Sequence, residues 1–169
     1  TDKLWFWEEL ESGKWESSTF DVFDKYLDQD TVFLDVGGWI GSTFLYAVQK
    51  AKQGIVFEPD PSAFKELETN IGLNKTSTWY SRCEAVKSAI APESGKVKLG
   101  FRNASGDSMS SVLLSGSGNG EEVKAISLSE FVRSRKLENE KLFVKMDVEG
   151  FEYDILPSLK EFIQQLQNA

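Results

Sequence analysis

The stretch TVFLDVGGWIG, residues 31–41, decides how this chain is expected to fold. Its first half, Thr31–Val36, is short, apolar and rich in β-branched residues, which is typical of a strand buried on both faces. Glycines end this strand, and Phe44, Leu45 and Val48 then recur at helical spacing. The stretch therefore predicts a buried strand, a tight glycine turn and a helix.

The same order of elements is repeated further along the chain. Gln53-Gly54 is expected to close the first helix, and Ile55–Phe57 is a second predicted strand. Asp60 then suits the N-cap of the next helix, and Pro61 suits its first residue. Further strands are predicted at 83–86, 97–101, 123–126 and 142–146. Strands that alternate with helices across short connections predict an α/β fold with a doubly wound, mostly parallel sheet.

Two capping boxes are expected to begin helices near the end of the chain. Ser127 and Glu130 form the first, and Ser158 and Glu161 form the second. Pro157 should break the helix that starts near residue 151, so that the second box restarts it.

The 169 residues fit one domain with its own hydrophobic core. We expect residues 30–169 to form this domain and residues 1–29 to pack on it. Segment 1–29 carries Trp5, Phe6, Trp7 and Trp15 among acidic residues, so an alternative is an aromatic lid that faces a substrate. Residues 102–120 are rich in Gly, Ser and Asn and predict a long loop.

Composition excludes several classes of protein. The net charge of −8 argues against a nucleic-acid partner, and no apolar run approaches the length of a membrane span. The first residues lack the layout of a secretory signal. With one cysteine, Cys83, there is no internal disulfide, and there is no zinc-type cluster. We expect a cytoplasmic protein that needs no metal.

The glycine loop is a candidate ligand site. In doubly wound sheets ligands bind at the carboxyl ends of the strands, which is where Asp35 precedes Gly37, Gly38 and Gly41. Glu58 ends the next strand and is placed to accept hydrogen bonds from the ribose hydroxyls of an adenosine.

The glycine spacing separates two classes of cofactor. The dinucleotide pattern G-x-G-x-x-G requires glycines at positions where this chain has Trp39 and Ser42, or Ile40 and Thr43. A carboxylate at Asp35 would also repel a pyrophosphate, whereas it suits a cationic ligand without phosphate. The loop therefore disfavours a dinucleotide.

A second group of charged residues follows the last predicted strand. Lys145, Asp147 and Glu149 lie at its carboxyl end, and Asp147 and Glu149 would face one crevice if the strand persists through them. The two carboxylates could hold an acceptor substrate, act as a general base or bind a metal. Alternatively, they only favour the start of the following helix.

Several motifs together resemble a known family. The FkbM-type S-adenosylmethionine-dependent methyltransferases are similar in the segments Asp35–Gly41, Val56–Asp60, Asn70 with Asn74, Gly106–Ser111 and Lys145–Glu152. The resemblance implies a Rossmann-like class I methyltransferase fold with S-adenosylmethionine as cofactor. It also implies methyl transfer to a hydroxyl of a small acceptor, such as a sugar or a polyketide.

The resemblance also implies roles for single residues. Near the methionine end of the cofactor it places Asp35, Gly37 and Gly41, in one loop with Gly38 and Trp39. Trp39 stands where many methyltransferases have a glycine. Around the adenosine it places Glu58 at the ribose, with Pro59, Asp60, Ser88 and Ala89 near the adenine.

The catalytic end of the site follows in the same way. Asp147 and Glu149 would face the methyl group and the acceptor. Because the sequence contains no histidine, they are the first candidates for a general base, and Lys145 is the next.

The resemblance implies a sheet of seven strands, of which this chain supplies about four. The strand at 142–147 would then lie at an open edge, which is a liability for an apolar strand. We therefore expect a C-terminally incomplete fold, with the chain being part of a longer enzyme. Two other functions remain open: a non-catalytic binding domain on the same scaffold and an NAD(P)-binding oxidoreductase.

Overall fold

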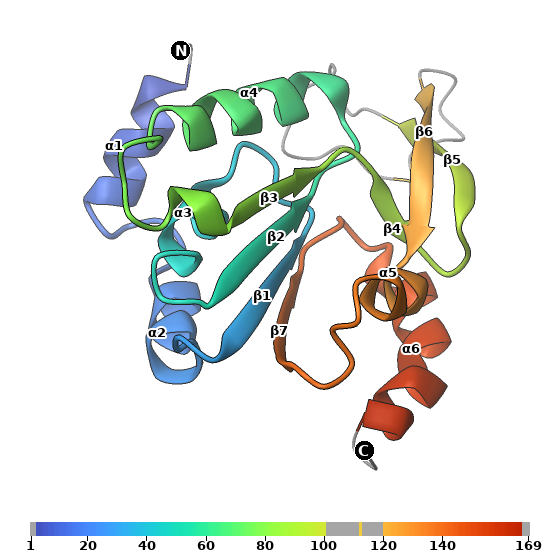
Figure 1. Cartoon of the computed structure of the whole chain (residues 1–169). Helices are drawn as coiled ribbons and strands as arrows, with labels where there is room; N and C mark the ends of the chain where they lie inside the picture. The colour runs from blue at the N-terminus through green and yellow to red at the C-terminus, as the bar shows by residue number, and fades with distance from the viewer. Residues whose placement is uncertain (1–2, 101–111, 113–119, 167–169) are drawn as a thin grey trace.

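The computed structural model describes residues 3–100, 112 and 120–166. Its central sheet has four parallel strands in the order β3-β2-β1-β7, which are Cys83–Val86, Gln53–Phe57, Thr31–Val36 and Lys141–Met146 (Figure 1). A smaller sheet has the order β4-β6-β5, made of Ala89–Ala91, Gly120–Ser127 and Gly95–Gly100. In it β4 runs parallel to β6, and β5 runs antiparallel to β6.

Helices cover both faces of the central sheet. Figure 1 shows α2, α3 and α4 on one side and α5 and α6 on the other. The helices are α1 Leu4–Glu11, α2 Ser17–Tyr26, α3 Ser42–Ala47, α4 Pro61–Gly72, α5 Leu128–Ser134 and α6 Glu152–Leu166, with a 3-10 turn at Tyr80–Arg82. The predicted doubly wound α/β fold is confirmed.

Strand β1 explains why its sequence is a continuous apolar run. Val32, Leu34 and Val36 belong to the hydrophobic cluster that includes residues of α5 and α6. Phe33 points to the opposite cluster, which includes residues of α2, α3 and α4. Because successive side chains of a strand alternate between faces, a strand buried on both sides needs apolar residues at almost every position.

The start of α4 is also as predicted. Asp60 is the N-cap, its Oδ1 atom accepts hydrogen bonds from the backbone N–H groups of Ser62 and Ala63, and Pro61 is the first helical residue. Because β2 ends at Phe57, Glu58 lies directly after the carboxyl end of that strand.

The predicted break at Pro157 is wrong. Helix α6 runs from Glu152 to Leu166 with Pro157 inside it. Ser158 does not cap a new helix, because its hydroxyl donates to the carbonyl of Ile155 at 2.6 Å. Pro157 stands only in the second turn, and the apolar face of α6 is held to the core by buried Ile155, Leu159 and Phe162.

The capping box at α5 is also wrong in its contacts. Ser127 is the N-cap but makes no capping hydrogen bond with its side chain. Ser94, which precedes β5, takes over both partners: its Oγ atom accepts the Ser127 N–H at 2.9 Å and donates to the carboxylate of Glu130. A residue distant in sequence therefore replaces the local pairing.

Gln53-Gly54 does not close a helix, because both residues lie in β2. A Cβ atom on Gly54 would come within 2.8 Å of the side chains of Phe44 and Val48, so the glycine lets α3 pack closely on the strand. Most of the predicted loop at 102–120 lies outside the described residues, as does the segment Gly106–Ser111.

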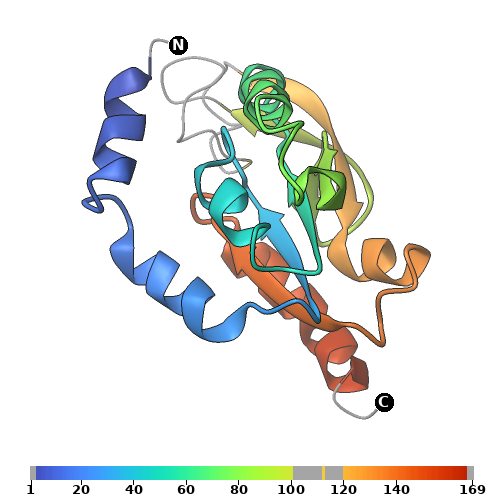
Figure 2. The ribbon, with the colours of Figure 1, turned by 60° about the vertical axis from the view of Figure 1, so that its left-hand side comes forward.

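The N-terminal helices follow one another along one side of the molecule (Figure 2). Phe6 of α1 is fully buried, and Lys3 forms an ion pair with Glu66 of α4 at 3.0 Å. At the other side of the central sheet, β7 is an edge strand among the described residues. None of the described helices is long and apolar enough to cross a membrane.

Candidate functional site

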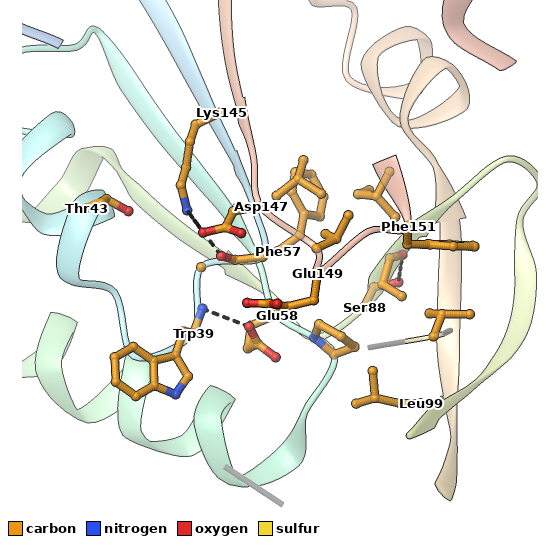
Figure 3. Close-up of a pocket in the computed structure, with 18 of the residues that line it drawn as sticks. Trp39, Thr43, Phe57, Glu58, Ser88, Leu99, Lys145, Asp147, Glu149 and Phe151 are labelled. Atoms are coloured by element: carbon orange, nitrogen blue, oxygen red, sulfur yellow. Dashed lines mark hydrogen bonds and ion pairs between the residues drawn. The ribbon is translucent and has the colours of Figure 1, made fainter. Parts of the chain in front are cut away.

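A cavity of about 320 Å³ opens at the carboxyl ends of β1, β2 and β7 (Figure 3). Ten of the residues predicted for the site line it: Gly37, Gly38, Trp39, Glu58, Pro59, Ser88, Ala89, Lys145, Asp147 and Glu149. Its volume falls in the range of small-molecule sites. Parallel strands bring these residues together because their carboxyl ends meet at one edge of the sheet.

Glu58 lies in the wall of this cavity with 6% of its surface exposed. Its Oε2 atom accepts the Trp39 N–H at 2.8 Å, and its Oε1 atom accepts the Asp60 N–H at 2.8 Å. Burial raises the pKa of Glu58 to about 8, although both N–H groups favour the ionised form. The carboxyl group is therefore fixed in place and ready to accept hydrogen bonds from a ligand.

Three predicted site residues lie behind the cavity wall rather than on it. Asp35 and Asp60 are fully buried and are not among the lining residues. Gly41 faces α4, where a Cβ atom would come within 2.7 Å of Leu67. Asp35 and Asp60 therefore support the loops around the cavity, and a direct contact with a ligand is not available to them in this arrangement.

Asp35 forms a buried ion pair across the sheet. Its Oδ1 atom lies 3.3 Å from the Lys145 Nζ atom, and its Oδ2 atom accepts a hydrogen bond from the Thr43 hydroxyl at 3.3 Å. The same Nζ atom lies 3.4 Å from the Gly37 carbonyl oxygen and 3.7 Å from Asp147 Oδ2. Lys145 thereby links the ends of β1 and β7.

The charge of Lys145 follows from these neighbours. Burial by itself lowers the pKa of Lys145, but the carboxylates of Asp35 and Asp147 outweigh it, and the pKa lies above its usual range. Lys145 is therefore an ammonium group at neutral pH and is poorly suited to take a proton.

Asp147 and Glu149 both line the cavity, but not for the reason the sequence suggested. Strand β7 ends at Met146, and Glu149 has a left-handed backbone with φ of 53°. The condition that the strand persists through Glu149 is not met, because a turn follows as soon as the Asp147 N–H has bonded to the Val36 carbonyl at 2.9 Å. The turn, not the alternation of a strand, brings both carboxylates to the cavity.

Trp39 also has a left-handed backbone, with φ of 47°. Its ring packs edge-on against Phe6, with ring centroids 4.9 Å apart, and the Lys3 Nζ atom lies 4.6 Å from its centroid. The side chain thus connects the glycine loop to α1.

Sequence reasoning missed part of the cavity wall. Trp15 and Glu16, which join α1 to α2, line it, and their separation from the glycine loop hid this placement. Trp15 was named only among the aromatics of segment 1–29, for which a lid that faces a substrate was the alternative to packing on the domain. The other missed residues are mainly apolar and come from several elements: Val36, Ser42, Thr43, Phe57, Ile90, Leu99, Val112, Val148 and Phe151.

The cavity wall around Ser88 is tied to the small sheet. Ser88 is buried, and its hydroxyl lies 3.0 Å from the Lys124 carbonyl oxygen of β6. In the part of the chain that the structure describes, no three His, Cys, Asp or Glu side chains come together in a group that could hold a metal ion.

Two comparisons with known proteins find similar proteins. The family model of the methyltransferase FkbM domain matches residues 35–167. The fold is similar to that in a crystal structure of methyltransferase FkbM from Methylobacillus flagellatus KT, with a TM-score of 0.58 and 15% sequence identity. The match covers 82% of this chain and 31% of that one. A comparison with curated proteins finds no significant match.

Proposed function

The chain belongs to the FkbM methyltransferase family, and from this premise we propose that it binds S-adenosylmethionine and methylates a hydroxyl oxygen of a small acceptor. A sugar or another natural product is the acceptor class we propose. The observation that carries the proposal is the fixed carboxyl group of Glu58 in the cavity wall. A buried acceptor at this strand end suits the two hydroxyls of a ribose.

The rest of the cavity fits the same ligand. Ser88, Ala89, Ile90 and Leu99 form a wall of low polarity that suits an adenine ring. Among the described lining residues, Lys145 is the single basic side chain, and Asp35 already pairs with it. A cavity with this charge would hold a pyrophosphate poorly, which disfavours the oxidoreductase alternative.

The bound cofactor supplies an electrophilic methyl group on a sulfonium sulfur. The protein then has to hold an acceptor oxygen in line with that group and to accept the proton that the oxygen loses. We assign the proton to Asp147 or Glu149, which line the cavity next to Lys145. Lys145 stays protonated and positions Asp147 by its charge at 3.7 Å.

The pH dependence of cofactor binding tests the role of Glu58. Ribose hydroxyls that donate to Glu58 favour its ionised form, so a ligand must displace a proton below the pKa of about 8. The affinity for S-adenosylhomocysteine, measured by calorimetry, should therefore rise with pH by up to about tenfold per unit and level off above about pH 8.

The matched variant is Glu58→Gln, which cannot ionise. At about pH 8 it should bind S-adenosylhomocysteine roughly 10- to 100-fold more weakly than the wild type, the cost of losing hydrogen bonds to a charged group. Its affinity should change less with pH than that of the wild type. An identical pH profile in both proteins would rule out Glu58 as the group responsible.

The general base is tested with Asp147→Asn and Glu149→Gln. Methyl transfer to a panel of hydroxylated acceptors is followed through the release of S-adenosylhomocysteine, after calorimetry has shown that each variant still binds the cofactor product. One of the two variants should lose at least about 100-fold in kcat, the usual contribution of a positioned base. Wild-type rates in both would contradict this assignment.

A further inference from the structure

Trp39 places a hydrogen-bond donor against Glu58 from a backbone conformation that bulky residues rarely adopt. Its φ of 47° lies in the left-handed region. Its backbone N–H donates to Glu58 Oε2 at 2.8 Å. Because the direction of this N–H depends on the backbone conformation, any contact that holds Trp39 also orients Glu58.

The contacts that hold the Trp39 ring come from the N-terminal segment. Phe6 of α1 packs edge-on against it, and the Lys3 Nζ atom lies 4.6 Å from its centroid. Phe6 is itself fully buried and also packs edge-on against Trp7 and Trp15. The rings of Phe6, Trp7 and Trp15 lie outside the two main hydrophobic clusters. We call these three residues the N-terminal aromatic cluster.

The cluster is tied to the main body of the protein next to the site. Lys3 pairs with Glu66 of α4 at 3.0 Å, and the N-cap of α4 is Asp60, whose N–H is the second donor to Glu58. Figure 2 shows α1 at the outer side of the molecule, before the chain enters the sheet. Residues 4–11 also lie outside the range 35–167 that matches the family domain.

We infer that Phe6 is a positioning residue of the cofactor site: by packing on the Trp39 ring, it holds the left-handed backbone that directs the Trp39 N–H to Glu58. The inference rests on the proposed function, because it concerns the affinity for the cofactor. Segment 1–29 then contributes to the affinity of the site for the cofactor, in addition to packing on the domain.

The expected size of the effect follows from the backbone. A left-handed conformation is disfavoured for a residue with a side chain, by about tenfold or more in population. When the ring loses its packing, the conformation that presents the N–H becomes a minor one. The measured affinity is then the intrinsic affinity multiplied by the fraction of molecules in the conformation that can bind the ligand.

The first experiment measures the affinity for S-adenosylhomocysteine by calorimetry in the Phe6→Ala and Leu4→Ala variants of the 169-residue chain. Leu4 is on the same helix but is 61% exposed, so it is the matched control. Phe6→Ala should bind about tenfold more weakly, and Leu4→Ala should bind as the wild type does. Phe6→Leu, which keeps an apolar side chain, should have an affinity between those of the other two variants. It replaces Phe6→Ala in the comparison if Phe6→Ala is poorly folded.

The pH profile separates positioning from a general loss of structure. Burial is the main cause that raises the pKa of Glu58, and the carboxylates of Asp60 and Asp35 add to it, whereas the backbone N–H groups of Asp60 and Trp39 lower it. Phe6→Ala should therefore shift the midpoint of the binding profile to higher pH. In a variant that was only less stable, less of the protein would be folded and able to bind, but the midpoint of the binding profile would stay at the same pH.

The second experiment compares Trp39→Gly with Trp39→Ala. Both remove the ring, but glycine adopts the left-handed conformation without strain and alanine does not. Trp39→Ala should therefore bind S-adenosylhomocysteine several-fold more weakly than Trp39→Gly. Adding Phe6→Ala to Trp39→Gly should change the affinity little, because the ring on which Phe6 acts is gone.

The outcomes are distinguishable. A wild-type protein that does not bind S-adenosylhomocysteine contradicts the proposed function and the inference with it. Binding by the wild type with equal affinity in Phe6→Ala overturns the inference and leaves the proposed function standing. Equal affinities of Trp39→Ala and Trp39→Gly overturn it as well, since they would show that only the ring mattered.

Discussion

Lys145→Met should lower the free energy of unfolding by about 3–5 kcal/mol, the cost of leaving a buried charge without its partner. Asp35 is fully buried, and its nearest cation is the Lys145 ammonium at 3.3 Å. Methionine fills much of the volume of lysine but supplies no charge, so that the Asp35 carboxylate is left with the neutral Thr43 hydroxyl, which donates to its Oδ2 atom at 3.3 Å. Urea denaturation near neutral pH measures the change.

Two controls make this prediction specific. Lys141→Met, on the same strand, removes an ion pair with Asp28 in which both side chains are more than half exposed, and should cost under about 1 kcal/mol. The double variant Asp35→Asn/Lys145→Met removes both charges and should recover most of the loss. An equal loss in the single and the double variant would show that packing, and not charge, is responsible.

The pH dependence of the Lys145→Met variant has a defined sign. Burial raises the pKa of Asp35, and the Lys145 ammonium opposes this rise in the wild type. Without the ammonium, the folded state of the variant binds a proton more readily than the unfolded state does. Its stability therefore falls as pH rises, and its deficit should be smaller at about pH 5 than at about pH 8.

Gly37→Ala should have the second large effect, a loss of about 2–5 kcal/mol in unfolding free energy. A Cβ atom on Gly37 would lie 1.9 Å from the backbone oxygen of Asp147, and the φ of 82° is unfavourable for alanine. Because the obstacle is backbone, the ends of β1 and β7 must separate. Thermal unfolding of the two proteins checks this.

The change should also reach the site. Separating the two strand ends weakens the bond from the Asp147 N–H to the Val36 carbonyl and moves Asp147 from the cavity wall. The control is Gly72→Ala at the end of α4, where an added Cβ meets no atom within 4 Å. It should stabilise the protein slightly, by up to about 1 kcal/mol, because alanine favours a helix. Stability equal to that of the wild type in Gly37→Ala would contradict the clash.

Local patterns predicted the elements well where the deciding contacts are local. The apolar run of β1, the cap at Asp60 and the strand at 142–146 depend on neighbouring residues, and each was placed within one or two residues. The errors at Pro157 and at the Ser127 box have the opposite cause. There, packing of α6 on the core and a hydroxyl from Ser94 outweighed the local signal.

For the site, the sequence by itself predicted which strand ends would meet, and with them Glu58 and Asp147, since parallel strands place their carboxyl ends together. The turn after β7, which brings Glu149 to the same cavity, was not predicted. Only the tertiary structure decided what each residue touches. It placed Asp35 behind the wall against Lys145, and it brought Trp15 and Phe6 to the glycine loop. Contacts between residues far apart in the chain depend on how whole elements pack, and no local spacing encodes that packing.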